Sequence, residues 1–137
     1  MQILYPVFAM FALTAFVVFR LGLMRLSAIR RKAVDARLYK SFQGYEEPER
    51  LRIASRHVLN LFEAPVLFYV VAILIYVADQ VSAALVVLSW LYVLARCVHS
   101  YIHLTSNRLP RRFQAFVASW IALTLIWIIF AGQLALT

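Results

Sequence analysis

Residues 64–95, APVLFYVVAILIYVADQVSAALVVLSWLYVLA, decide the fold of this chain. Residues 64–78 and 81–95 are two apolar runs, and only Asp79 and Gln80 separate them. Each run is long enough to form most of a membrane-spanning helix. Because the separating residues are polar, the chain must turn back there. The stretch therefore predicts a helical hairpin in a membrane.

Two further runs, residues 3–19 and 113–137, contain no charged residue. The whole chain has 137 residues, of which 64% are hydrophobic and 15% charged, whereas a soluble domain carries about 25% charged residues. We do not expect a signal peptide at residues 3–19, because no basic region precedes them and Arg20 and Arg25 continue the helix. We predict one all-α integral membrane domain, residues 1–137, built as a bundle of four transmembrane helices. Its spans are approximately 3–27, 50–78, 81–105 and 110–136, joined by loops 28–49 and 106–109.

Basic residues gather on one side of these spans. Residues 28–52 and 106–112 hold Arg30, Arg31, Lys32, Arg37, Lys40, Arg50, Arg52, Arg108, Arg111 and Arg112. The two termini and the turn at Asp79 hold none, and cytoplasmic loops of membrane proteins are enriched in Lys and Arg. We therefore expect both basic loops in the cytoplasm and both termini outside. The net charge of +8 does not indicate nucleic acid, because the aromatic residues lie in the spans and not among the basic ones. Residues 30–47 fit either a short surface helix or a loop.

Polar side chains continue the second and third spans toward the basic side. They are Arg56, Asn60 and Glu63 on the second span, and Arg96, His99 and His103 on the third. Spacings of three and four residues place each trio on one helix face. In an antiparallel pair that turns near residues 79 and 80, residues whose numbers sum to about 159 lie at equal depth. This predicts that Glu63 meets Arg96, Asn60 meets His99 and Arg56 meets His103.

An unpaired charge within a span is expensive, so we expect an ion pair between Glu63 and Arg96. Such a polar ladder is either a device that holds the two helices in register or a site for an anionic ligand that enters from the cytoplasm. A metal site of His99, His103 and Glu63 is not expected, because the nearby arginines would repel a divalent cation. His57 lies one residue off the stripe, and we expect it at a rim or an interface.

These residues resemble a known family. Arg56, Asn60 and Glu63 form R-x3-N-x2-E, followed by Pro65, and the remaining matches are Arg96, His99, Arg108, Pro110 and Arg112. In order and spacing they resemble the membrane-associated proteins in eicosanoid and glutathione metabolism, MAPEG. That family includes microsomal glutathione transferases, prostaglandin E synthase, a leukotriene-forming synthase and a non-catalytic lipoxygenase-activating protein. The resemblance implies a homotrimer of four-helix bundles that binds glutathione between subunits near the cytoplasmic side.

The resemblance also implies roles for individual residues. The expected glutathione ligands are Arg56, Asn60, Glu63, Arg96, His99, His103 and Arg108. Arg112 would lie near the thiol as the catalytic residue, since an adjacent Arg lowers a thiol pKa. The implied activity is a glutathione-dependent transferase or peroxidase acting on lipophilic electrophiles, with glutathione as co-substrate. The alternative is a non-catalytic membrane protein of the same fold that binds a lipid or an anion.

Two positions depart from the eicosanoid enzymes. His103 and Phe116 stand where those proteins have tyrosines, four residues after the matched His and the matched Arg. These departures resemble a bacterial branch of the family, so we expect a bacterial inner membrane protein. A transporter with a proton relay is disfavoured, because four short spans offer no obvious pathway.

Overall fold

The computed structural model describes residues 1–41 and 46–136, and every regular element among them is a helix. In chain order these are α1 (Leu4–Arg30), α2 (Leu38–Ser41), α3 (Glu49–Leu61), α4 (Ala64–Val77), α5 (Ala83–Leu104) and α6 (Leu109–Ala135). Four of the described segments are long and apolar enough to cross a membrane: α1, α3 with α4, α5, and α6. The predicted all-α fold class with four transmembrane helices is therefore confirmed.

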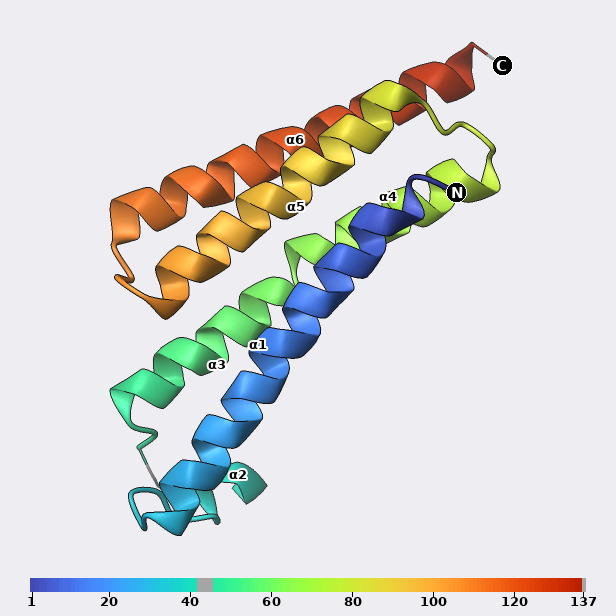
Figure 1. The fold of residues 1–137 in the computed structure, drawn as a ribbon. Helices are drawn as coiled ribbons and strands as arrows, with labels where there is room; N and C mark the ends of the chain where they lie inside the picture. Colours follow the sequence, from blue (N-terminus) through green and yellow to red (C-terminus); the bar gives the residue numbers. More distant parts are fainter. Residues whose placement is uncertain (42–45, 137) are drawn as a thin grey trace.

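The helices form an antiparallel bundle (Figure 1). α5 and α6 make a closely packed hairpin, while α1 runs beside α3 and α4. The first residues of the chain and the end of α6 lie at the same end of the bundle (Figure 1). We call the opposite end the basic end; it holds the last turns of α1 and α5 and the first turns of α3 and α6.

The hairpin expected at Asp79 and Gln80 is present. Asp79 adopts a left-handed conformation with φ 55°, and the Gln80 N–H donates to the Ile75 carbonyl at 3.0 Å, which terminates α4. Ser82 then caps α5 by accepting from the Leu85 N–H at 3.5 Å. These local bonds satisfy backbone groups at the turn and send α5 back along the bundle.

The second span is broken between α3 and α4. α3 ends at Leu61 and α4 begins at Ala64, so Phe62 and Glu63 lie outside both helices. Pro65 is in the first turn of α4, where its missing N–H removes a bond that a continuous helix would need. The break lies at the level where the polar stripe of α3 ends, and it places Glu63 in an exposed position.

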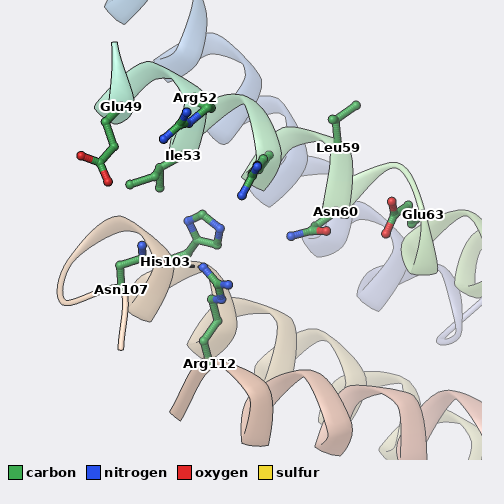
Figure 2. A pocket seen from close by; sticks show the side chains of 10 residues that line it. Glu49, Arg52, Ile53, Leu59, Asn60, Glu63, His103, Asn107 and Arg112 are labelled. Atoms are coloured by element: carbon green, nitrogen blue, oxygen red, sulfur yellow. Dashed lines mark hydrogen bonds between the residues drawn. The ribbon is translucent and has the colours of Figure 1, made fainter. Parts of the chain in front are cut away.

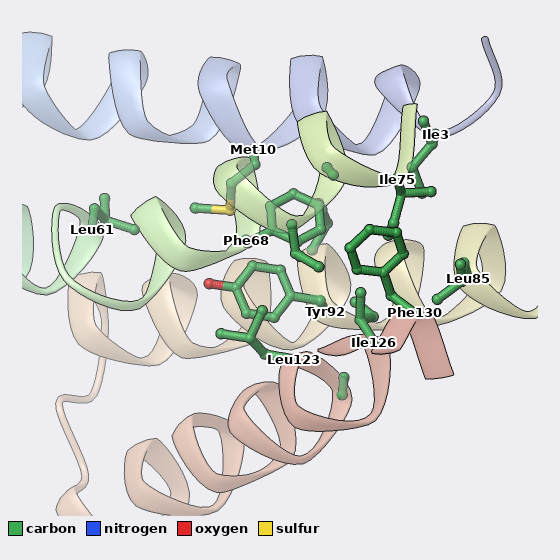
Figure 3. Packing of buried hydrophobic residues seen from close by; sticks show 14 of the residues in the cluster. Ile3, Met10, Leu61, Phe68, Ile75, Leu85, Tyr92, Leu123, Ile126 and Phe130 are labelled. Atoms are coloured by element: carbon green, nitrogen blue, oxygen red, sulfur yellow. The ribbon is translucent and has the colours of Figure 1, made fainter. Parts of the chain in front are cut away.

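The hydrophobic core occupies the half of the bundle away from the basic end (Figure 3). Met10, Phe68, Tyr92, Leu123 and Ile126 come from four different spans and are each at most 1% exposed. The rings of Phe68 and Tyr92 stack with their centroids 4.6 Å apart. A smaller apolar cluster, which includes Leu21, Leu38 and Leu51, packs α1, α2 and α3 together toward the basic end, so the polar groups there lie beside it.

Large apolar side chains also cover the outside of the bundle. On α1 they are Tyr5, Phe8, Phe11, Phe16 and Phe19, each more than half exposed. A water-soluble protein rarely leaves so continuous an apolar surface open. This surface fits a hydrocarbon environment, in agreement with an integral, multi-pass membrane protein.

The connection after α1 is held against the bundle by Arg25. Its Nη2 donates to Ser55 Oγ at 2.9 Å, its Nε lies 3.5 Å from Glu47 Oε1, and its guanidinium lies 4.9 Å from the centroid of the Tyr39 ring. Glu47 also accepts hydrogen bonds from Ser55 and Tyr39. Of residues 30–47, whose structure the sequence left open, residues 38–41 form the short helix α2, and residues 42–45 lie outside the described part.

Candidate functional site

A cavity of about 450 Å³ lies near the basic end, between α3 and the junction of α5 with α6 (Figure 2). Its lining is mostly polar and charged. The lining residues are Glu49, Arg52, Ile53, Arg56, Leu59, Asn60, Glu63, His103, Asn107 and Arg112. Five of them, Arg56, Asn60, Glu63, His103 and Arg112, were predicted as site residues. The structure therefore brings residues from two distant parts of the chain into one cavity, which we call the mixed-charge cavity.

One wall of the mixed-charge cavity is a single face of α3. Glu49, Arg52, Arg56 and Asn60 follow one another at intervals of three or four residues within α3, so their side chains share that face, while Glu63 lines the cavity from the break just beyond it. In Figure 2 the side chains of Glu49, Arg52 and Asn60 lie along this wall. Glu49 and Arg52 extend the predicted stripe by two turns toward the basic end. This extension can be found in the sequence, because Glu49 and Arg52 keep the spacing of three or four residues.

The opposite wall comes from the end of α5 and the start of α6. His103 and Arg112 point from this wall toward α3 (Figure 2). The Arg112 Nη1 donates to Asn107 Oδ1 at 2.6 Å. Asn107 itself has φ 46°, a left-handed conformation that Asn tolerates better than most residues. The tight connection between α5 and α6 thus holds the Arg112 guanidinium in the cavity.

A smaller pocket of about 150 Å³ adjoins the mixed-charge cavity and shares Asn60 and Arg112 with it. Its other lining residues are His99, Leu109, Phe113 and Phe116. Most of these are apolar and belong to α6. Arg112 therefore stands at the border between a polar cavity and an apolar pocket.

The expected ion pair between Glu63 and Arg96 is wrong. Arg96 is 0% exposed, and its Nη2 donates to the backbone carbonyl of Asn60 at 2.9 Å. Within the described residues it makes no ion pair with Glu63. The equal-depth rule assumes a continuous second helix, whereas the break after Leu61 frees the Asn60 carbonyl from its helical partner and leaves Glu63 exposed. Arg96 therefore fastens α5 to the break, and the Glu63 carboxylate lines the cavity.

The position expected for His57 at a rim or interface is also wrong. His57 is 0% exposed, its Nε2 lies 2.9 Å from Ser100 Oγ, and its ring stacks on His103 with the centroids 4.4 Å apart. It thus packs behind His103 and supports that side chain from inside the subunit. The sequence does indicate the contact between His57 and Ser100, because their numbers sum to 157, close to the value of about 159 expected for residues at equal depth.

Two other predicted site residues lie outside the mixed-charge cavity. His99 is 3% exposed and lines the smaller pocket. Arg108 is exposed, precedes α6, and lines none of the cavities described here. In the described part of the chain, no group of three or more His, Cys, Asp or Glu side chains is arranged to hold a metal ion.

Comparison with protein families identifies this architecture. The family model described as "MAPEG family" matches residues 3–132, which is nearly the whole chain. Comparisons with curated proteins and with solved structures gave no match. The family match spans all four membrane helices and both walls of the mixed-charge cavity. The chain therefore belongs to the MAPEG family.

Proposed function

We propose that this protein binds glutathione in the mixed-charge cavity and transfers it to, or uses it to reduce, lipophilic electrophiles. Membership of the MAPEG family makes it a membrane protein of a family concerned with glutathione and eicosanoids. The observation that carries the proposal is that guanidinium groups and carboxylates line a single cavity. A ligand that carries both carboxylates and an ammonium group, as glutathione does, can use both kinds of side chain.

The charges of the cavity match those of glutathione. Its two carboxylates suit the planar guanidinium groups of Arg52 and Arg56, each of which can donate two parallel hydrogen bonds. Its single ammonium group suits Glu49 or Glu63. A volume of about 450 Å³ falls in the range of about 300–1,000 Å³ that is usual for small-molecule sites.

The position of Arg112 suggests how the thiol would react. A guanidinium beside a thiol favours the thiolate, which is the nucleophilic form. In the transferase reaction the thiol proton passes to water, the sulfur bonds to the electrophilic carbon, and the leaving group departs with its electron pair. In the peroxidase reaction two glutathione molecules are oxidised to the disulfide while a hydroperoxide is reduced to an alcohol and water. The apolar pocket formed by Phe113 and Phe116 would receive the lipophilic partner beside Arg112.

The remaining predicted ligands have less direct roles in this proposal. Arg96 would act through the Asn60 backbone that it holds, and His99 would contact the ligand from the smaller pocket. His103, supported by His57, would face the ligand at the end of α5. Arg108 would attract the anionic ligand from the open rim.

We also propose that the basic end faces the cytoplasm of a bacterial inner membrane, with both termini outside. The supporting observation is the concentration of basic residues at that end. A homotrimer would cover the charged face of α3, since Arg56 and Glu63 are exposed in the single subunit. Such charges within a span are normally covered by protein.

Titration calorimetry and a turnover assay together test the proposal. Purified protein in a neutral detergent is titrated with glutathione, and conjugation is followed with an aryl halide. We expect Arg112→Ala to lose turnover by about 100-fold or more while it still binds glutathione. Arg111→Ala is the matched control, because Arg111 is exposed and lines none of the described cavities; it should keep both properties.

Three results would count against this function. Absence of glutathione binding at millimolar concentration would reject it. Equal turnover in the Arg112→Ala and Arg111→Ala proteins would reject the role of Arg112. Binding without turnover of aryl halides or hydroperoxides would identify the alternative, a non-catalytic binding protein of the same fold.

A further inference from the structure

A second cavity, of about 340 Å³, also borders His103. Helix α1 forms one of its walls, whereas α1 does not line the mixed-charge cavity. This second cavity is bounded by α1, α3 and the end of α5, and we call it the cationic cavity. Its polar lining consists of Arg20, Arg50, His103, Thr105 and Asn107. Among the described residues no carboxylate lines it, whereas Glu49 and Glu63 line the mixed-charge cavity. The two cavities therefore differ in the sign of charge that they can accept.

Arg20 is the group in this cavity that most needs a partner. It lies ten residues before the end of α1 at Arg30, which places it about 15 Å along the helix from the basic end. In the described part of the chain it has no hydrogen-bond or ion-pair partner, whereas Arg25, one and a half turns later, has both. A charged side chain at such a depth normally has a counter-charge. The described residues supply none within the cavity, so the partner is expected to be a bound anion.

The other lining groups are suited to an anion with several oxygen atoms. Arg50 is in the first turn of α3, while Thr105 and Asn107 follow α5. The cavity thus extends from these residues at the basic end down to Arg20. The guanidinium groups of Arg20 and Arg50 and the amide of Asn107 converge from three segments and can donate to oxygens pointing in different directions, as those of a tetrahedral phosphate do. A planar carboxylate would use only part of this set.

We propose that the cationic cavity binds a phosphate group, either as free phosphate or as the headgroup of an anionic lipid. An apolar groove of about 430 Å³ shares Arg20 and Met24 with the cavity and runs along α1 past Leu23 and Leu51. This groove offers a lipid additional contacts that free phosphate cannot make. The proposal does not depend on glutathione binding, because Arg20 and Arg50 do not line the mixed-charge cavity.

The test measures binding of two probes to protein purified in a neutral detergent. One probe is inorganic phosphate, and the other is short-chain phosphatidylglycerol, with the corresponding phosphatidylcholine, whose choline cation brings the net charge of the headgroup to zero, as the comparison. Calorimetric titration is carried out on the wild type, Arg20→Gln, Arg50→Gln and the control Arg111→Gln, which removes an exposed charge from outside the described cavities. Because a charge-assisted hydrogen bond is lost, we expect each cavity variant to bind at least about tenfold more weakly, and the control to stay within about twofold.

The outcomes separate the possible ligands. Binding of both anionic probes, with loss in the cavity variants, supports a site for the phosphate group itself. Binding of phosphatidylglycerol alone, with the same losses, assigns the site to a lipid headgroup, and binding of phosphate alone assigns it to a soluble anion. Failure of both probes to bind the wild type, or equal affinity of Arg20→Gln and Arg111→Gln, would overturn the proposal. Arg20→Lys keeps the charge, and if Arg20→Gln does not fold, partial retention of binding in Arg20→Lys serves as the readout.

Discussion

Replacing Glu63 by Gln separates two roles that the sequence could not distinguish. If Glu63 held α5 through an ion pair with Arg96, its loss would leave a buried guanidinium without a counter-charge, at a cost of about 3–5 kcal/mol in the free energy of unfolding. The structure instead gives Arg96 the Asn60 carbonyl as its partner at 2.9 Å and leaves Glu63 exposed beside the cavity. We therefore expect the free energy of unfolding to change by no more than about 0.5 kcal/mol.

The same substitution should weaken glutathione binding. A hydrogen bond between a carboxylate and an ammonium group contributes about 1.5–3 kcal/mol, which corresponds to a roughly 10- to 150-fold change in affinity. Gln keeps the shape of the side chain and removes the charge, so the change reports on that charge. The Kd for glutathione is measured by calorimetric titration, and the free energy of unfolding by denaturant titration of the detergent-solubilised protein.

Glu46→Gln is the matched control, because it removes the same charge from an exposed residue that lines none of the described cavities. It should leave both the stability and the affinity unchanged. A loss of about 3 kcal/mol in Glu63→Gln would refute the reasoning about Arg96. An affinity for glutathione equal to that of the control would refute the assignment of Glu63 to the ligand's ammonium group.

Three further substitutions test single side chains in other parts of the bundle. Ser100→Ala should lower the free energy of unfolding by about 1–3 kcal/mol, because His57 Nε2 then stays buried without its partner. Denaturant titration measures this change, and a value below about 0.5 kcal/mol would contradict the prediction. Tyr92→Phe should raise the free energy of unfolding by about 1 kcal/mol, because the Tyr92 hydroxyl is buried without a hydrogen-bond partner in the described part of the chain. A loss of stability in the same titration would show that this hydroxyl does have a hydrogen-bond partner. Burial, followed by the charge of Glu47, raises the pKa of Tyr39 above its ordinary value of 10, so the folded state holds this proton more tightly than the unfolded state. The resulting stabilisation is complete below pH 10 and is lost as the pH rises above it. The melting temperature should therefore fall between about pH 9.5 and about pH 11.5 by a larger amount in the wild type than in Tyr39→Phe, and equal falls would argue against the shift.

Several features of the fold could be predicted because they depend on properties read along one helix. The length and lack of charge of a run are enough to predict a span, since a bilayer sets both. Asp79 and Gln80 predicted the hairpin because two polar residues between apolar runs cannot remain in hydrocarbon. The polar stripe of α3 was visible for a similar reason, because intervals of three and four residues place side chains on one helix face.

The candidate site could be predicted only in part. The structure places Arg56, Asn60, Glu63, His103 and Arg112 around one cavity, but it directs Arg96 to a backbone carbonyl and leaves Arg108 outside the described cavities. The pairing rule failed at Glu63 because a break in a helix rotates every residue beyond it. Pro65 has no N–H to donate to the Leu61 carbonyl four residues earlier, but nothing in the sequence shows that Arg96 bonds the Asn60 carbonyl instead.

Amino-acid order alone therefore determines the class of protein, the number of membrane helices and the end of the bundle at which the charges gather. These follow from hydropathy and from the helical period, which are local properties. Only the tertiary structure decides which of the charged side chains share a cavity. It buries His57 behind His103, and it directs Arg25 to Ser55 and Glu47 while Arg20, on the same helix, faces a cavity without acidic groups. The physical reason is that the partner of a side chain depends on which helix faces pack together, and in a bundle those faces are far apart in the sequence.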